Sequence, residues 1–267
     1  MYLNHLRLTV MTSTSFVLEG RIDAPVLVVA NSLGANHLMW EPQMAEWKQH
    51  FLVLRYNYRG HGDTPANGDV ASTQDLAQDA IALVDHLGIA SFSWLGLSLG
   101  GMLGLYMAAH YPNRVNSLVS ACFRPHQTDE TRAQWATRIQ TVREKGLGSI
   151  VDGTVDRWLT EGFRKSHPQV DQALRNMVGA NHADGYMACG KAVMDYDSRP
   201  YIHQVVCPVL LMSGAHDMGA PTAEVANLNQ VLVNSRHEVL PAAHIANQEC
   251  PEKFQELSTE FVLQHGK

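Results

Sequence analysis

Short apolar runs rich in β-branched residues recur along this chain, and stretches of helical periodicity separate them. A run of about four to eight such residues is typical of a buried strand. The pattern therefore predicts strands at Pro25–Ala30, Phe51–Tyr56, Ser91–Leu97, Val115–Ala121, Pro208–Gly214 and Arg236–Leu240.

The stretches between these runs have apolar residues along one helical face, as Leu76, Leu83 and Leu87 show for the first of them. Strands that alternate with helices predict an α/β fold with a mostly parallel sheet and helices on both faces. We expect an antiparallel hairpin over Leu6–Leu18 in front of this sheet, and ligands at its carboxyl edge. The predicted helices are Ser72–Leu87, Met102–His110, Thr222–Leu232 and Glu252–Leu263.

The alternation stops between Pro125 and Asp197, where consecutive segments all have helical patterning. We interpret residues 125–197 as an inserted helical cap, or lid, on a core formed by residues 1–124 and 198–267. The chain has no internal repeat and no low-complexity linker, which favours one domain with a lid. The predicted cap helices are Arg132–Glu144, Ile150–Thr160, Val170–Val178 and Gly185–Asp195.

Length and composition fit a globular protein, since 45% of the 267 residues are hydrophobic. A formal net charge of −6 and the lack of a Lys/Arg run argue against nucleic acid as a partner. The start of the chain, Met1–Val10, has Asn4, His5 and Arg7 where a signal peptide needs apolar residues, and no run approaches membrane-spanning length. We expect a cytoplasmic protein with no membrane partner.

The cysteines are dispersed and form no C-x-x-C pair or metal-ligand spacing. Neither a metal site nor a disulfide framework is predicted, and reduced thiols are the simplest interpretation. They are Cys122, Cys189, Cys207 and Cys250.

The pentapeptide Gly96-Leu97-Ser98-Leu99-Gly100 lies between a predicted strand and a predicted helix. This is the setting of a nucleophile elbow, in which small residues on both sides let the chain turn sharply and present a serine hydroxyl. Ser98 is therefore the candidate catalytic nucleophile. An ordinary turn between strand and helix is the alternative interpretation.

A serine hydroxyl is a weak nucleophile, so Ser98 needs a histidine base and an acid that orients the histidine. In doubly wound hydrolases the chain order is serine, acid, histidine, each on a loop that follows a strand. Asp217 and His244 satisfy this order after the last two predicted strands. A second acid position, after Val115–Ala121, holds Cys122 here. A helix-capping aspartate and a surface histidine are the alternatives.

Hydrolysis through a tetrahedral oxyanion also needs backbone N–H donors. Leu99, directly after the nucleophile, is one candidate, and Leu33 in the loop Asn31-Ser32-Leu33-Gly34 is the other. Asn31 and Ser32 also fit an ordinary turn pair.

With these pieces in place, the chain resembles the α/β-hydrolase superfamily over nearly its full length, and within it the 3-oxoadipate enol-lactonase group. The resemblance implies an α/β-hydrolase fold with a mostly parallel eight-stranded sheet and an inserted helical cap. The matching stretches are Asn31-Ser32-Leu33-Gly34, Met39-Trp40-Glu41-Pro42-Gln43, Tyr58-Arg59-Gly60-His61-Gly62, Leu95–Gly101, Trp135 with Arg138-Ile139, Arg157-Trp158-Leu159-Thr160, Asp184–Cys189, and Ala242-Ala243-His244 with Asn247, Glu249 and Pro251.

Two segments depart from the group's usual pattern, and both are expected to border the pocket. Cys122–Gln127 replaces an Asn-Thr-Ala type segment, and Asp217–Pro221 lacks a Thr-Pro-Pro type continuation. The particular substrate therefore stays open.

The resemblance implies hydrolysis of a small lactone or ester, most like 3-oxoadipate enol-lactone, with no metal or organic cofactor. Cap aromatics Trp135, Trp158 and Tyr186 are candidates for the pocket wall or for plain packing, and Arg124 or Arg138 for pairing with a substrate carboxylate. Alternative functions are a carboxylesterase, a cofactor-free perhydrolase, and a non-catalytic ligand receptor on the same fold. Oligomeric state is not indicated by any of these patterns.

Overall fold

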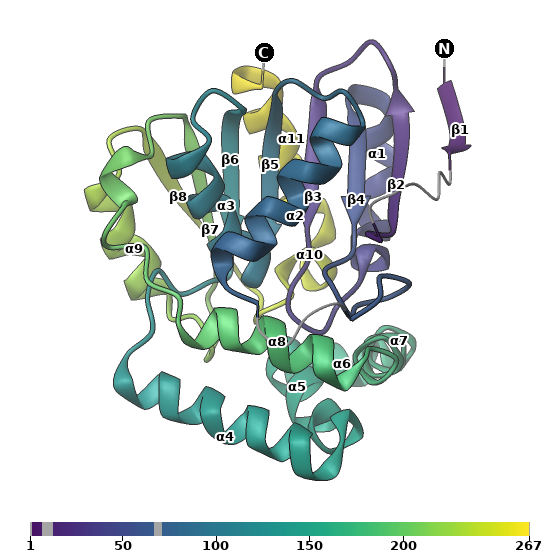
Figure 1. Cartoon of the computed structure of the whole chain (residues 1–267), viewed down its shortest axis with the longest axis vertical. Coiled ribbons are helices and arrows are strands. Elements are labelled where there is room, and N and C mark those ends of the chain that lie inside the picture. The colour runs from purple at the N-terminus through teal and green to yellow at the C-terminus, as the bar shows by residue number, and fades with distance from the viewer. Residues whose placement is uncertain (1, 7–12, 67–70, 267) are drawn as a thin grey trace.

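The computed structural model of the chain, which describes residues 2–6, 13–66 and 71–266, is built around a sheet of eight strands (Figure 1). The strand order is β1-β2-β4-β3-β5-β6-β7-β8. Strand β2 pairs antiparallel with both β1 and β4, and the remaining neighbours are parallel. The strands are β1 (Tyr2–Leu6), β2 (Phe16–Arg21), β3 (Val26–Ala30), β4 (Leu52–Tyr56), β5 (Phe92–Leu97), β6 (Val115–Ala121), β7 (Val209–Gly214) and β8 (Ser235–Leu240).

The predicted strands and the mostly parallel eight-stranded sheet are confirmed. The expected hairpin over Leu6–Leu18 has its two ends paired as antiparallel partners, although residues 7–12 lie outside the described part of the chain. Its second strand continues to Arg21, beyond the predicted end.

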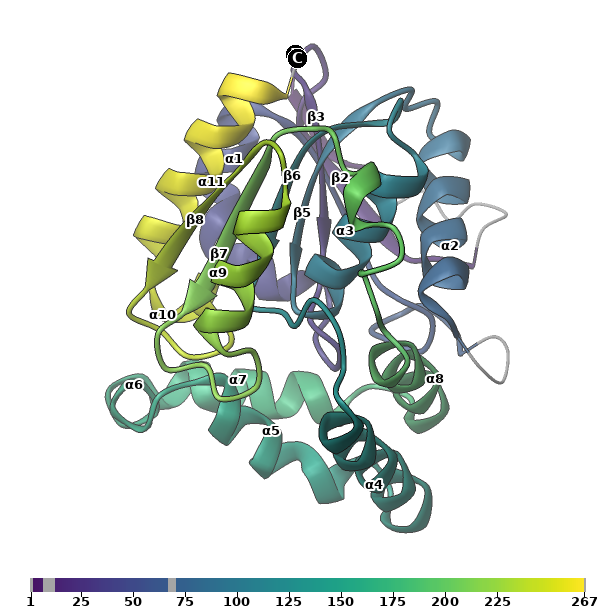
Figure 2. The same cartoon turned by 90° about the vertical axis from the view of Figure 1, so that its left-hand side faces the viewer.

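Helices cover both faces of the sheet, with α1 and α11 on one side and α2, α3 and α9 on the other (Figure 2). Successive strand residues point to opposite faces, so Leu27 and Val29 join one buried cluster and Val28 and Ala30 the other. These helices are α1 (Glu41–His50), α2 (Thr73–His86), α3 (Leu99–His110), α9 (Thr222–Val231) and α11 (Pro251–His265). The short α10 (Ala246–Glu249) lies between β8 and α11, and η1 (His37–Trp40) and η3 (Ile202–Gln204) are 3₁₀ turns.

Between β6 and β7 the chain forms the helices that lie across the carboxyl edge of the sheet, at the bottom of Figure 1. The predicted helix Ile150–Thr160 is shorter, because its first residue ends a 3₁₀ turn and its last caps the next helix. The elements are α4 (Asp129–Lys145), η2 (Leu147–Ile150), α5 (Val151–Trp158), α6 (Glu161–Ser166), α7 (Pro168–Gly179) and α8 (Ala183–Met194).

The two connections to this helical segment run side by side. His126 and Asp197 form an antiparallel bridge, flanked by a hydrogen bond of 3.0 Å from the Ser198 N–H to the Pro125 carbonyl. We retain the division into core and cap at these connections as a proposal, and the word cap below means residues 125–197.

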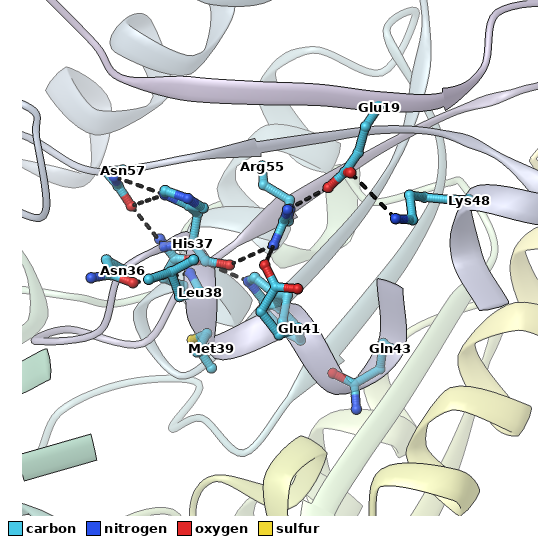
Figure 3. Close-up of polar contacts among 12 residues, drawn as sticks. Glu19, Asn36, His37, Leu38, Met39, Glu41, Gln43, Lys48, Arg55 and Asn57 are labelled. Carbon is cyan, nitrogen blue, oxygen red and sulfur yellow. Dashed lines mark hydrogen bonds and ion pairs between the residues drawn. The ribbon is translucent and has the colours of Figure 1, made fainter. Parts of the chain in front are cut away.

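A buried ion pair fixes the antiparallel side of the sheet to the start of α1 (Figure 3). Arg55 of β4 pairs with Glu19 of β2, and both side chains are 4% exposed. The same guanidinium donates to Glu41 at 2.7 Å and to the His37 carbonyl at 3.4 Å. Lys48 lies 3.5 Å from Glu19 on the other side. This network holds η1 and α1 in place directly after the loop at residues 31–34.

None of the helices in the described ranges is long and apolar enough to cross a membrane. All four cysteines are free thiols in this structure. Burial raises the pKa of Cys189 to about 12 and that of Cys207 to about 11, so both are protonated at neutral pH.

Candidate active site

Ser98 lies at the sharp corner between β5 and α3. Its backbone has φ 58° and ψ −114°, a strained conformation for a residue other than glycine. A Cβ on Gly96 would lie 2.0 Å from the Gly100 carbonyl oxygen, and a Cβ on Gly100 would lie 2.0 Å from that of Ala30. Both glycines are therefore required by close packing of the backbone at this corner. The geometry is that of a nucleophile elbow.

Asp217 and His244 form a hydrogen-bonded pair at the same edge of the sheet. Asp217 Oδ2 accepts from His244 Nδ1 at 2.7 Å, and the other oxygen, Oδ1, accepts from the backbone N–H groups of Gly219 and Ala220 at 2.8 and 3.0 Å. The aspartate side chain is fully buried and that of the histidine is 14% exposed. A carboxylate on Nδ1 places the ring proton there, so Nε2 has a free lone pair.

A cavity of about 490 Å³ brings these residues together beneath the cap. Ser98, Asp217 and His244 all line it, with residues from the core loops and from α4, α5 and α8. Among the described residues the Ser98 hydroxyl makes no hydrogen bond, so a hydrogen bond between Ser98 and His244 is a proposal and not an observation. Serine–histidine hydrogen bonds are often long before a substrate binds.

The loop after β3 is a tight turn that leaves the backbone N–H of Leu33 without a hydrogen bond among the described residues. Ser32 accepts from the Ala35 N–H at 3.0 Å, and Gly34 has φ +89°. Leu33 lines the cavity. Within the described residues, the backbone N–H of Leu33 has no acceptor, and neither does that of Leu99 at the first position of α3. Both are thus available to an anion.

Asn31 anchors the beginning of this loop. Its side chain donates to the Tyr56 carbonyl and accepts from Trp40 Nε1, both at 2.8 Å. Its own carbonyl accepts from the Gly100 N–H at 3.1 Å. The loop and the elbow are therefore directly connected.

The three aromatic residues predicted for the pocket wall all line the cavity. Tyr186 and Trp158 are also buried, at 1% and 5% exposure, and Trp135 is half-buried. They serve as packing and as lining at once.

The two arginines proposed for a substrate carboxylate differ in their surroundings. Arg124 lines the cavity but is paired with Glu224 at 2.5 Å and donates to the Gly219 carbonyl at 2.7 Å. Arg138 donates to the Tyr186 hydroxyl at 2.6 Å and to Thr154, and within the described residues it has no carboxylate partner. Arg138 is therefore the better candidate for binding an anion.

Arg157 of α5 is a third arginine that lines the cavity, and its side chain was not among the residues predicted for the pocket. In the described part of the chain it also has no carboxylate partner. Desolvation, followed by repulsion from Arg138, lowers the pKa of Arg157 below its usual value. Two arginines in one cavity wall that form no salt bridge within the described residues favour an anionic ligand.

A family model described as the alpha/beta hydrolase fold matches residues 25–249. The chain belongs to the α/β-hydrolase fold family. It is 36% identical to 3-oxoadipate enol-lactonase 2 of Acinetobacter baylyi, over 88% of this chain and 87% of that protein. It is 29% identical to 3-oxoadipate enol-lactonase 1 of the same organism, over 93% and 92%.

Solved structures agree with this assignment to the α/β-hydrolases. The enol-lactonase from Burkholderia xenovorans superimposes with a TM-score of 0.90 at 30% identity, covering 94% of this chain and 96% of that one. A hydrolase from Pseudomonas aeruginosa has the same TM-score at 29% identity, covering 97% of each chain. The resemblance inferred from the motifs is confirmed.

In this α/β-hydrolase, the loop that carries His244 is bonded to the cap on both sides. Glu249 accepts from the Ala243 N–H at 2.8 Å and, through its other oxygen, from the Thr160 N–H at 3.1 Å. The Ile245 N–H donates to the Trp158 carbonyl at 3.0 Å. The position of His244 is therefore tied to the junction of α5 and α6.

The two segments in which this hydrolase departs from the enol-lactonase pattern both border the cavity. Phe123, Arg124 and Gln127 line it from the first, and Met218 and Gly219 from the second. Met218 is 75% exposed, so it lies at the mouth of the cavity.

Proposed function

We propose that this chain is a serine hydrolase that opens a small lactone bearing a carboxylate, most like 3-oxoadipate enol-lactone. The hydrogen-bonded pair Asp217–His244, lining one cavity with the strained elbow serine Ser98, carries the proposal. The enol-lactonase relatives support the same substrate class.

In the proposed reaction, Ser98 Oγ attacks the lactone carbonyl carbon while His244 Nε2 takes the hydroxyl proton. The carbonyl oxygen becomes an oxyanion that accepts from the N–H groups of Leu33 and Leu99. Asp217 orients the imidazolium and stabilises its charge. The ring C–O bond then breaks, and the His244 imidazolium gives its proton to the leaving enolate, which becomes a ketone and leaves His244 neutral. The product of this half-reaction is an acyl-serine.

Water completes the cycle. His244 Nε2 takes a proton from a water molecule, whose oxygen attacks the acyl carbon and forms a second oxyanion at the same two N–H groups. The bond to Ser98 Oγ breaks, and the imidazolium returns the proton to the serine. The free carboxylic acid ionises on release.

Arg138 and Arg157 supply the substrate specificity in this proposal. Both cations lie in the cap wall of the cavity that contains Ser98, and neither has a carboxylate partner within the described residues. A carboxylate is held well by a planar guanidinium group with two parallel hydrogen bonds. A lactone with a carboxylate side arm therefore fits better than a neutral ester.

The test follows the ultraviolet loss of 3-oxoadipate enol-lactone with the wild type and with Ser98→Ala. Short p-nitrophenyl esters and simple lactones are assayed in parallel. Fast turnover that Ser98→Ala abolishes supports the proposal. Cleavage of only the neutral esters would replace the carboxylated lactone by a general esterase function. Absence of turnover with every compound would reject catalysis and favour a ligand receptor.

A further inference from the structure

The peptide groups around Gly34 are held at both ends by side chains from two distant segments. The Gly34 N–H donates to His61 Nε2 at 3.1 Å, and the Gly34 carbonyl accepts from Asn181 Nδ2 at 2.7 Å. His61 comes from the turn after β4 and Asn181 from the connection between α7 and α8. Both side chains are buried.

The hydrogen bonds fix the state of His61. A backbone N–H can only donate, so Nε2 accepts from Gly34, and Nδ1 carries the ring proton toward the Arg59 carbonyl at 3.1 Å. Burial lowers the pKa of His61 to about 4, which keeps the imidazole neutral at neutral pH. The ring is thus a permanent acceptor for the loop.

Asn181 connects three segments. Besides the Gly34 carbonyl, its side chain accepts from the Gly62 N–H at 3.1 Å and donates to the Met177 carbonyl at 3.0 Å. The loop after β3, the turn that carries His61 and the end of α7 therefore meet at one amide group. A residue of the cap completes the support of a core loop.

The direction of the Leu33 N–H follows from this support. The Ser32 carbonyl and the Leu33 N–H belong to one planar peptide and point in opposite directions. The bond from the Ala35 N–H to Ser32 fixes that plane, and the two bonds at Gly34 fix the next part of the turn. Without them the turn around Gly34 is free to rotate its peptide groups.

We propose that His61 and Asn181 are positioning residues, which clamp Gly34 and so aim the Leu33 N–H at the developing oxyanion. The inference rests on the proposed function, because it assigns the clamp a role in stabilising the transition state of that hydrolysis. Neither side chain contacts the substrate in this proposal. Loss of the clamp should therefore lower kcat and leave KM nearly unchanged.

The test compares His61→Leu, which removes the acceptor, with His61→Gln, whose amide oxygen reaches about as far as Nε2. Asn181→Ala removes the hydrogen bond to the Gly34 carbonyl, and it tests the clamp independently if His61→Leu does not fold. Ser117→Ala is the matched control, since it removes a buried hydrogen bond to Ser93 at the opposite end of the sheet. Each variant is assayed for kcat, KM, Tm and inhibition by a trifluoromethyl ketone, which forms an oxyanion on the serine.

We expect His61→Leu and Asn181→Ala to lower kcat by about 10- to 100-fold and to weaken trifluoromethyl ketone binding by a similar factor. KM should stay within about 2-fold, and His61→Gln should recover most of kcat. Variants with a lower Tm but wild-type kcat and ketone affinity would overturn the clamp and leave the proposed hydrolysis intact. A wild type with no Ser98-dependent turnover would overturn the proposed function, and the clamp with it.

Discussion

Glu249 accepts a hydrogen bond of 2.8 Å from the Ala243 N–H, the residue before His244. Its second oxygen accepts from Thr160 in the cap. One carboxylate thus joins the histidine loop to the segment that covers the cavity.

Replacement of Glu249 by glutamine should lower kcat/KM by about 10-fold, because an amide NH₂ group would then face a backbone or hydroxyl donor. Steady-state kinetics with the best substrate measure the change. Glu252→Gln, an exposed position on the first turn of α11, is the control and should behave as wild type. Equal kinetics for both variants would show that the link to the cap does not hold His244.

Asp217→Asn should lower kcat by about 10³- to 10⁴-fold, the scale of loss when the acid of a serine triad becomes an amide. The fold should survive, since Asn Oδ1 can still accept from the N–H groups of Gly219 and Ala220. His216→Gln changes the exposed neighbouring histidine and should leave kcat unchanged. A large loss in His216→Gln would contradict the assignment of His244 as the base.

Arg138→Met and Arg157→Met should each raise KM for a carboxylated lactone by about 10- to 100-fold, the worth of a charge-assisted hydrogen bond. KM for a neutral p-nitrophenyl ester should change by less than about 2-fold. Arg132→Met, an arginine of α4 that is paired with Asp129, serves as the control. Similar effects on charged and neutral substrates would argue against a carboxylate subsite.

Burial of His61 predicts a loss of stability in acid. Its pKa is lowered to about 4 in the folded protein, from 6.5 as the ordinary value, so the unfolded chain binds a proton that the folded chain does not. The resulting loss in the free energy of unfolding is absent above pH 6.5 and reaches about 3 kcal/mol as the pH falls to 4. Urea unfolding of the wild type and His61→Gln from pH 8 to pH 4 measures it. The two stability curves should converge as the pH falls, and parallel curves would contradict the shift.

The two acidic partners of Arg55 are expected to contribute unequally to the free energy of unfolding, because Glu19 is buried and Glu41 is exposed. Glu19→Gln leaves a buried guanidinium without its main partner and should lower the free energy of unfolding by about 3 kcal/mol. Glu41→Gln removes a partner that is 55% exposed and should cost less than about 1 kcal/mol. Urea denaturation measures both. Equal losses would mean that burial does not set the strength of these pairs.

The fold was predictable because its strands and most helices have strong periodicity on their own. Helix α1 was missed because it has few apolar positions and Pro42 near its start, which gives it little amphipathic pattern. The short α6 has no buried residue, so it had no pattern to detect.

The site was predictable where a short motif carries the chemistry, as for Ser98, or where chain order does, as for Asp217 and His244. These three roles stay predictions until they are tested by mutation. No sequence pattern indicated a role for Asn181, because that role depends on a contact with Gly34, 147 residues away in the chain. Sequence patterns do not separate Arg124 from Arg138, because the contact that neutralises Arg124 comes from Glu224, which is distant in the chain.

The adjacent connections at His126 and Asp197 have an evolutionary consequence. A segment that leaves and returns at one point can be exchanged for another without a change in the register of the sheet. Such an exchange would alter the pocket wall while the elbow stayed intact. The graft would have to bring its own counterparts of Thr160 and Asn181, since these two residues join the exchanged segment to the loops that hold the reacting groups.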